Sequence, residues 1–201
     1  SAHTSDDEAE RALHAYILRH GGPHDHPAPR KLVFQPGYRE RFWHRNCVAI
    51  GLSGGFIAPL EASALAMVEL AAITLADDMP VTRAAMEIVA QRFNESFTYR
   101  WERVIEFLKL HYVLSRRDGA YWQDHRAAAS IPQRLRDLME LWRHRPPSRH
   151  DFPRHEDVFP SASYQYVLYG MGFTSAPGTA CMPQDGPRAE GCFAEAAELT
   201  R

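Results

Sequence analysis

The sequence predicts a mainly helical fold with a few short β-strands near its N-terminal end. After residue 82, apolar residues recur every three to four positions, which is the period of one helix face. Before that point, short apolar runs flank a Pro-Gly turn dipeptide at 36–37, as strands do. The chain has 201 residues, 45% hydrophobic and 24% charged, so it is long enough to bury a sizeable core.

The charge and the cysteine content argue against several classes of protein. A net charge of -2 gives no electrostatic reason to bind nucleic acid or an anionic membrane. The three cysteines, Cys47, Cys181 and Cys192, fit neither a disulfide framework nor a zinc site, so we expect a reducing cytoplasm. The stretch 47–76 is strongly apolar, but its glycines, its proline and its two glutamates favour a protein core over a membrane span.

The first element is expected to be a helix over residues 6–19. Ser5 and Glu8 form the capping box S-x-x-E, in which each side chain bonds the backbone of the other residue, and the glycine pair at 21–22 ends the helix. The polar, acidic start of the chain is not a signal peptide. Because the chain also lacks an initiator methionine, we expect it to be a piece of a longer protein.

A proline-rich loop is expected next, over 24–30. Its sequence His24-Asp25-His26 offers side chains that can bind a metal. Ligands on such a loop are usually solvated, so we predict no metal site.

Three elements are expected ahead of the long helical part. A β-hairpin pairs 32–35 with 38–43 around the Pro-Gly dipeptide, which suits a type II turn. The unbroken apolar run 47–50 predicts a strand buried on both faces. After a glycine-rich turn, a buried apolar helix is expected from Pro59 to about residue 76, because the fixed φ of proline suits a first helical turn.

Helices account for most of the remaining chain. Thr82 caps a helix that runs to about Ser115 and carries an aromatic face, which we interpret as core. Tyr121-Trp122 opens a short helix. A second capping box at 130–133 leads a helix through Trp142.

The last part of the chain gives weaker signals. The segment 162–172 is aromatic and either helical or extended, and a loop is expected over 174–187. A final helix is expected over 188–200.

The stretch 46–65 is where we expect the chemistry. It combines a strand, a glycine-rich turn and the start of a helix, whose unpaired backbone donors and dipole can hold an anion. Glu61 is the only carboxylate between Asn46 and Glu69. A lone ionisable group at the mouth of a buried helix needs a partner, water or a function.

The residues alone leave three interpretations of this turn open. Gly51-Leu52-Ser53-Gly54-Gly55 matches the nucleophile elbow G-x-S-x-G, with Ser53 as a hydrolase nucleophile, although an elbow's helix begins directly after its serine. The turn could instead contact a phosphate or a cofactor, although the fingerprint Gly-x-Gly-x-x-Gly is absent. In the third interpretation the glycines allow close packing and Glu61 is salt-bridged.

The same stretch resembles the second conserved block of the flavin-dependent tryptophan halogenase family. The resemblance rests on Asn46-Cys47-Val48-Ala49-Ile50-Gly51-Leu52, followed by Phe56 and Pro59-Leu60-Glu61. It extends over roughly residues 1–175. Further similar positions are Phe42-Trp43, Arg92-Phe93-Asn94, Leu108-Lys109-Leu110-His111-Tyr112, Tyr121-Trp122 and Tyr166-Val167-Leu168-Tyr169-Gly170-Met171-Gly172.

The resemblance implies the C-terminal part of a flavin-monooxygenase-like, FAD/NAD(P)-binding α+β fold with a helical subdomain. Residues 1–80 would be a remnant of the FAD-binding domain, and residues 81–201 the helical subdomain on the substrate side. In this family reduced FAD, supplied by a separate flavin reductase, reacts with oxygen to a hydroperoxide that oxidises chloride or bromide. The resulting hypohalous acid reaches a small aromatic substrate, tryptophan or indole-like. A homodimer is one expected assembly.

The resemblance also assigns roles to residues. Glu61 aligns with a catalytic glutamate beside the substrate, where a carboxylate can stabilise positive charge on the ring or accept its proton. Ser63 and Ala64 align with the backbone that holds the halide. Flavin contacts are expected in the turn and early helix, at Gly51, Leu52, Ser53 and Leu65. Two tyrosines of the C-terminal aromatic segment are expected to line the substrate pocket, Tyr164 and Tyr166.

The sequence also departs from the family pattern. Ser63 and Ala64 stand where threonine and glycine are usual. The Gly-x-Gly-x-x-Gly turn, the catalytic lysine and the Trp-x-Trp-x-Ile-Pro motif are absent, so we expect this chain alone to be inactive. A flavin-dependent aromatic monooxygenase and a non-enzymatic helical module that binds a partner are the alternatives.

Overall fold

The computed structural model describes residues 2–25 and 27–176, together with positions 187, 190, 191, 194, 195 and 198. The helices are α1 (Asp6–Arg19), α2 (Ser63–Asp77), α3 (Arg83–Leu114), α4 (Ala120–Arg126), α5 (Gln133–Trp142) and α6 (Ser161–Gly170). The strands are β1 (Gly37–Tyr38), β2 (Trp43–His44), β3 (Cys47–Val48) and β4 (Gly55–Phe56), and single 3₁₀ turns lie at Gly51–Ser53, Ala128–Ser130 and Arg149–Asp151. The described chain is therefore mainly helical, as predicted.

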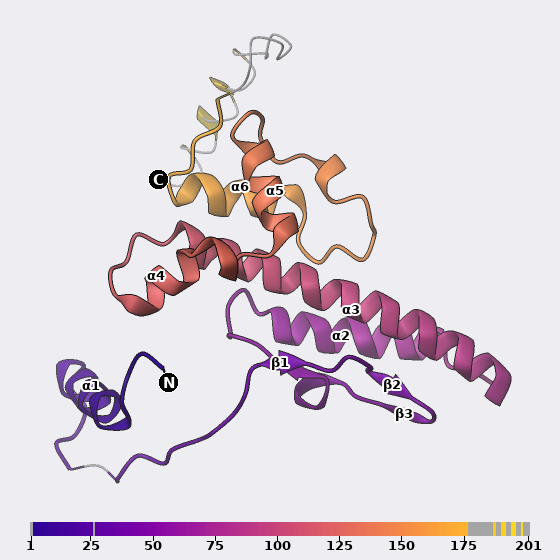
Figure 1. Ribbon diagram of the computed structural model, residues 1–201, viewed down its shortest axis with the longest axis horizontal. Coiled ribbons are helices and arrows are strands. Elements are labelled where there is room, and N and C mark those ends of the chain that lie inside the picture. Colours follow the sequence, from indigo (N-terminus) through magenta and orange to yellow (C-terminus); the bar gives the residue numbers. More distant parts are fainter. Residues whose placement is uncertain are drawn as a thin grey trace.

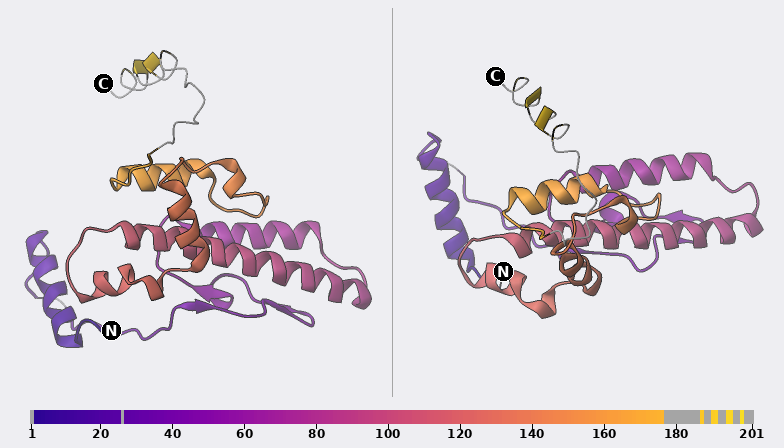
Figure 2. Two further views of the ribbon diagram at one scale, coloured as in Figure 1. Left: turned by 45° about the horizontal axis from the view of Figure 1, so that its top comes forward. Right: turned by 90° about the horizontal axis from the view of Figure 1, so that it is seen from above.

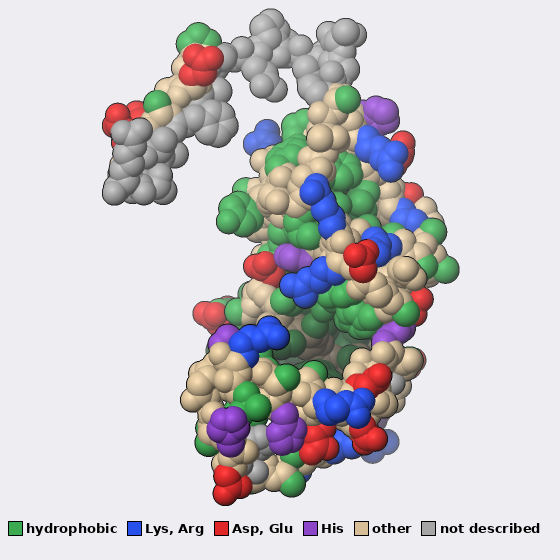
Figure 3. All heavy atoms as spheres, turned by 90° about the vertical axis from the view of Figure 1, so that its left-hand side faces the viewer, with side chains coloured by type: hydrophobic (Ala, Val, Ile, Leu, Met, Phe, Trp, Pro, Cys, Tyr) green, Lys and Arg blue, Asp and Glu red, His purple; other side chains and the backbone are tan. Residues whose placement is uncertain are grey.

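The long helix α3 runs through the middle of the molecule and the other elements pack on it from two sides (Figure 1). Helix α2 lies alongside it, with the short strands beneath, while α5 and α6 lie on the opposite side, and two further views show the same layers (Figure 2). Helix α1 stands apart and buries none of its residues. Seen from the side of α1, the surface is hollowed and hydrophobic side chains lie in the hollow (Figure 3).

The helices with clear local signals are where the sequence predicted them. The N–H of Glu8 donates to Ser5 Oγ at 3.2 Å, and the N–H of Ser5 donates to the Glu8 carboxylate at 2.9 Å, so the first capping box is confirmed. Thr82 Oγ1 accepts from the N–H of Ala85 at 3.1 Å and opens α3, which is unbroken over 32 residues. The short helix at Tyr121-Trp122 is also confirmed.

The second capping box is wrong. Ser130 Oγ lies 2.8 Å from the carbonyls of Asp124 and Ala127, to which it can donate, and the cap of α5 is Pro132, without a side-chain bond. The aromatic segment near the C-terminus is helical, as α6. The expected loop beyond residue 176 and most of the expected helix at 188–200 lie outside the described residues.

The strands pair differently from the predicted hairpin. Gly37–Tyr38 pairs antiparallel with Gly55–Phe56, far along the chain, and the local hairpin joins β2 to β3 through Arg45-Asn46, where Arg45 has φ 54°. The expected strand at 32–35 does not form, and its apolar side chains are exposed. The prediction of a strand buried on both faces at 47–50 is wrong as well, because Cys47 is exposed.

Helix α2 corrects a further prediction. It begins at Ser63 rather than Pro59, and only three of its residues are buried, Ser63, Met67 and Ala71. Leu65 is 74% exposed, and Val68 and Ile73 are exposed as well. The helix is apolar around most of its circumference, but in the described chain it buries only a narrow stripe.

An aromatic cluster joins the strands to α3. Trp43 packs edge-on against Phe93, and Phe42 stacks with Trp101. Asn94 fastens the same strand to the helix, because its Oδ1 accepts from the N–H groups of Phe42 and Trp43, both at 2.8 Å. This cluster joins residues on both sides of the predicted domain boundary at residue 80. The division into two domains stays a prediction.

Candidate functional site

The glycine-rich turn is compact and internally bonded. Gly51 has φ +63°, a conformation that favours glycine, and begins the 3₁₀ turn. Ser53 Oγ donates to the carbonyl of Ile50 at 2.8 Å. Helix α2 begins only at Ser63, ten residues later, so the strand-to-helix geometry of a nucleophile elbow is not formed around Ser53.

Glu61 lies before α2, in a turn with an unusual backbone. Glu61 has φ 58° and Ala62 has φ 50°, so two successive non-glycine residues are left-handed. Such a conformation costs on the order of 1–3 kcal/mol for each residue and is concentrated at functional sites. The expectation that Glu61 lies at the mouth of a buried helix starting at Pro59 is therefore wrong: α2 begins two residues after Glu61, and the Glu61 side chain is 45% exposed.

The left-handed turn brings Glu61 to α3. Glu61 Oε1 lies 3.1 Å from His111 Nε2, although the two residues are 50 positions apart. On its other side, His111 Nδ1 lies 3.0 Å from the carbonyl oxygen of Phe107, and the imidazole packs edge-on against the Phe107 ring. No functional role is predicted for His111 from the sequence, because it falls on the aromatic face of a helix, which indicates packing.

The first turn of α2 offers backbone donors. The Ser63 side chain is buried, and its Oγ donates to the carbonyl of Leu60 at 3.0 Å. The backbone N–H of Ser63 donates to the same carbonyl at 3.4 Å, near the limit of a hydrogen bond. The N–H of Ala64 donates to no backbone carbonyl within the described part of the chain, as expected for a first helical turn.

An apolar pocket of about 300 Å³ lies beside this turn. Four residues expected at the flavin or the halide line it together, namely Gly51, Leu52, Ala64 and Leu65. Phe42, Phe97 and Trp101 form its aromatic wall. The other predicted residues, Ser53, Glu61 and Ser63, are not among the lining residues. The structure therefore brings together only part of the predicted set.

The pocket is suited to a largely apolar group. Its walls carry aromatic and aliphatic side chains, and Leu52 and Leu65 are 81% and 74% exposed, so a bound ring system would cover them. These residues fit the ring portion of a flavin. The described residues offer no glycine fingerprint for the nucleotide portion.

The two tyrosines are not brought to this site. Tyr164 is 1% exposed and packs against Phe107 and Phe152, with ring centroids 4.8 and 4.4 Å apart. Burial raises the pKa of the Tyr164 hydroxyl. Tyr166 is 84% exposed, two positions along the same helix and therefore on a different face.

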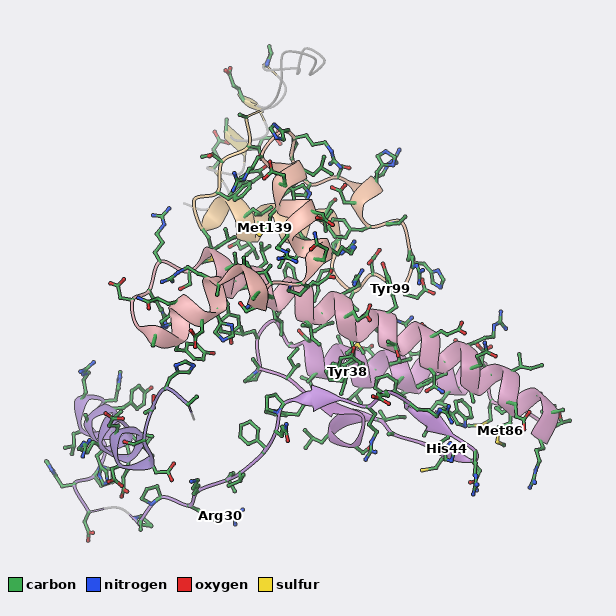
Figure 4. All side chains as sticks on the ribbon, viewed as in Figure 1. Arg30, Tyr38, His44, Met86, Tyr99 and Met139 are labelled. Atoms are coloured by element: carbon green, nitrogen blue, oxygen red, sulfur yellow. The ribbon has the colours of Figure 1, made fainter. Side chains whose placement is uncertain are left out.

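A second, larger groove of about 1230 Å³ was not anticipated from the sequence. It follows α3 from Arg83 to Glu102. His44, Met86 and Tyr99 are among its lining residues, and Figure 4 labels all three. Charged side chains of both signs line it, among them Glu40, Arg83 and Glu87. None of the predicted site residues belongs to this groove.

Two further properties concern only the part of the chain that the structure describes. No group of three or more histidine, cysteine, aspartate or glutamate side chains is arranged to hold a metal ion there. None of the helices in that part combines the length and the apolar character needed to cross a membrane.

Known proteins resemble this chain over most of its length. A family model described as tryptophan halogenase matches residues 1–184. Tryptophan 6-halogenase SttH of Streptomyces toxytricini is 33% identical over 171 residues, which are 84% of this chain and 31% of that protein. 7-Chloro-L-tryptophan 6-halogenase KtzR of a Kutzneria species is 27% identical over 179 residues, 89% of this chain and 34% of that protein. The chain thus spans about a third of the length of these relatives.

Solved structures share the fold. A crystal structure of a tryptophan halogenase from Shewanella frigidimarina superposes with a TM-score of 0.89 at 44% identity, over 98% of this chain and 38% of that one. BrvH, a flavin-dependent halogenase from Brevundimonas sp., superposes with a TM-score of 0.78 at 34% identity, over 98% of this chain and 40% of that one.

Proposed function

Because this chain belongs to the tryptophan halogenase family, we propose that the complete gene product is a flavin-dependent halogenase. Its substrate would be a small aromatic molecule, tryptophan or indole-like, and it would add chlorine or bromine. The fold would be completed as a flavin-monooxygenase-like domain, with residues 1–80 on the flavin side and 81–201 on the substrate side. A homodimer and a cytoplasmic location belong to the same proposal.

The observation that carries the proposal is the juxtaposition within residues 51–65. Leu52, Ala64 and Leu65 line an apolar pocket, the backbone N–H of Ala64 has no backbone acceptor among the described residues, and Glu61 lies three positions before Ala64 in the sequence. A hydrophobic surface for a ring, a donor for an anion and a carboxylate are the three parts that halogenation of an aromatic ring requires. They come from the 3₁₀ turn at 51–53, the left-handed turn at 61–62 and the first turn of α2.

Different residues of this chain would contact the flavin and the halide. Gly51, Leu52, Ser53 and Leu65 would contact reduced FAD, provided by a separate flavin reductase. With oxygen, the bound flavin supplies the oxidising power that converts halide to hypohalous acid. The backbone N–H of Ala64, and that of Ser63, whose bond to the Leu60 carbonyl is long at 3.4 Å, would hold the halide, since donors at a helix N-terminus and the helix dipole favour an anion.

Glu61 would act on the aromatic substrate. Replacing a ring hydrogen by halogen places positive charge on the ring and then releases a proton. A carboxylate next to the ring stabilises that charge and accepts the proton. The exposed side chain of Glu61 is open to a substrate. Tyr166 is the better placed of the two tyrosines to meet a ligand, whereas the burial of Tyr164 supports a packing role.

The test is a product analysis of the complete gene product. The protein is supplied with FAD, a flavin reductase with its reductant, oxygen, and bromide or chloride, and is offered tryptophan and a set of indoles. The expected product carries halogen, which its isotope pattern identifies. Glu61→Gln should cut turnover by about 10² or more while flavin binding is unchanged.

Other outcomes point to the alternatives. A hydroxylated product formed without halide would indicate a flavin-dependent monooxygenase. A protein that binds no flavin would indicate a helical partner-binding module. The 201-residue chain by itself should form no product, because its sequence lacks the glycine fingerprint and the Trp-x-Trp-x-Ile-Pro motif.

A further inference from the structure

We propose that His111 is a positioning residue, which holds the Glu61 carboxylate in place for its work on the substrate. The inference rests on the proposed function for the role of Glu61, and on the described contacts for the role of His111. Helix α3 would thereby take part in the reaction, although it contributes no residue to the apolar pocket beyond two aromatic rings.

His111 is itself held firmly on α3. Its Nδ1 lies 3.0 Å from the carbonyl of Phe107, one helical turn earlier. Its ring packs edge-on against the Phe107 ring, with centroids 5.1 Å apart. The Phe107 ring is 1% exposed and is fixed by the core. The His111 side chain, 21% exposed, therefore presents Nε2 in a defined direction.

The Glu61 side chain depends on this contact to hold one conformation. This side chain is 45% exposed, and among the described residues its one polar contact is the bond of 3.1 Å to His111 Nε2. A glutamate has three rotatable side-chain bonds, and holding it in one conformation has an entropic cost. A fixed partner across the turn reduces the cost that would otherwise arise when the substrate binds.

The two hydrogen bonds of His111 define where its protons lie. The carbonyl of Phe107 can only accept, so His111 Nδ1 carries a hydrogen. The contact between Nε2 and Oε1 then requires another hydrogen, from the imidazole or from the carboxyl group. One proton therefore lies between the two groups, and where the imidazole carries it the bond joins opposite charges and is directional as well as attractive.

The backbone around Glu61 is strained. Glu61 and Ala62, with φ 58° and 50°, are both in the left-handed region, which side chains disfavour. In this conformation the Glu61 side chain reaches His111 on α3. Strain of this kind persists only where surrounding contacts stabilise it. The bond to His111 is such a contact, and it links the strained turn to the core of the protein.

The experiment compares four variants in the complete gene product. His111→Leu removes the donor, and we expect kcat to fall about tenfold to a hundredfold with KM for the substrate and flavin binding within about twofold. His111→Gln keeps an N–H donor near the position of Nε2 and should restore most of kcat. In a Glu61→Gln background, His111→Leu should cause no further loss, because His111 acts through Glu61.

A matched control is available elsewhere in the chain. His144 Nε2 lies 3.7 Å from Glu140 Oε1, an exposed histidine–glutamate contact far from the turn. His144→Leu should leave kcat unchanged. An equal loss in both leucine variants, or a full additional loss in the Glu61→Gln background, would assign the effect to stability and overturn the inference.

A crystallographic measurement separates this inference from the proposed function. In wild-type crystals Glu61 should bond to His111, and in His111→Leu crystals its side chain should take up other rotamers. If Glu61 stays in the same place without His111, the inference is wrong whatever the enzyme does. If the wild type forms no halogenated product while the crystals behave as expected, the proposed function fails and the pairing stands.

Discussion

The two sides of α3 differ in how completely they are packed. On the helical side, residues 120–176, the side chains of Leu135, Trp142, Tyr164 and Leu168 are no more than 1% exposed. On the loop side, residues 37–77, Leu52 is 81% exposed and apolar residues of α2 face outward. The helical side buries its apolar surface against this chain, whereas much of the loop side remains uncovered.

The polar groups show the same contrast. On the helical side, Asp151 is buried and accepts hydrogen bonds from Arg145, from the indole N–H of Trp142 at 3.0 Å and from the backbone N–H of Ser148 at 2.9 Å. On the loop side, the Glu61 side chain bonds to His111 alone among the described residues, and its backbone is strained. Sites that bind and react are drawn from such incompletely stabilised regions, so the difference indicates which side carries function.

The largest effect is expected from the two tyrosines of α6. Tyr164→Ala should destabilise the helical side by about 3–5 kcal/mol, because a fully buried aromatic ring is removed from between three others. Tyr166→Ala should change stability by less than about 0.5 kcal/mol, since its side chain is exposed. Hydrogen exchange of the α5 and α6 amides in the complete gene product measures both.

Kinetics then tests the remaining role of Tyr166. If this side chain meets the substrate, Tyr166→Ala should raise KM for the aromatic substrate without loss of exchange protection. Equal loss of protection in both alanine variants would contradict the contrast between a packed and an exposed tyrosine.

The second effect comes from the buried carboxylate of the helical side. Asp151→Ala leaves Arg145 and the indole N–H of Trp142 without their acceptor and should cost about 3 kcal/mol, measured by the same exchange experiment. Glu140→Ala removes an exposed ion pair with Arg143 and should cost less than about 0.5 kcal/mol. A small loss at Asp151 would mean that solvent already reaches this group.

The pH dependence of that effect has a defined sign. Burial acts to raise the pKa of Asp151, but hydrogen bonds from Arg145, Ser148 and Trp142 outweigh it, and the pKa lies below the ordinary 3.8. Such a group stabilises the fold above its unfolded pKa and loses this contribution as pH falls through the folded one. The difference in stability between wild type and Asp151→Asn should stay constant above about pH 5 and shrink below 3.8.

A control with the opposite sign lies on α3. Burial raises the pKa of Glu106 above its ordinary 4.5, although Arg103 and Arg134 act to lower it. The advantage of wild type over Glu106→Gln should therefore grow as pH falls through this raised pKa towards 4.5. Parallel behaviour of the Asp151 and Glu106 variants would show that the acid response does not come from these two groups.

The same contrast explains what could be predicted from the sequence. Helices α1 and α3 were located closely because their caps, Ser5 with Glu8 and Thr82, are signals within four residues of the helix start. The apolar period then extends the helix without reference to the rest of the fold. Both signals depend only on residues that are close together in the sequence.

On the loop side, local signals failed because distant contacts decide the structure. Gly37 pairs with Phe56 rather than with a neighbour, so the Pro-Gly dipeptide makes no hairpin turn. Pro59 is a good first residue for a helix, but the left-handed pair at 61–62 delays α2 to Ser63. The residue types of the candidate site were read from a family resemblance, whereas the contact with His111, 50 positions away, had no local signal.

A third effect tests the uncovered surface of the loop side. Leu65→Ser should weaken flavin binding in the complete gene product by about tenfold or more, since burial of a leucine side chain contributes roughly 1.5–3 kcal/mol. Ile73→Ser is the matched control, because Ile73 is an exposed apolar residue of the same helix outside the pocket. Flavin fluorescence titration measures both. Equal losses would mean that α2 needs its whole apolar surface for folding.

The smallest effect tests the strain next to Glu61. Ala62, with φ 50°, adopts a conformation that costs an alanine about 1–2 kcal/mol relative to the right-handed one and costs glycine little. Glycine also loses more chain entropy on folding, about 0.5–1 kcal/mol. Ala62→Gly should therefore stabilise the turn by about 0.5–1 kcal/mol, measured by hydrogen exchange in the first turn of α2.

The control for this change is one helical turn further on. Ala66 lies inside α2, where glycine is unfavourable, so Ala66→Gly should destabilise the same amides by about 0.5–1 kcal/mol. Opposite signs at two alanines four residues apart would establish that the left-handed turn stores strain. If Ala62→Gly also lowers kcat, that strain serves to aim Glu61 at His111. If both glycine variants destabilise equally, residue 62 is helical in solution and the loop side is better stabilised than its backbone indicates.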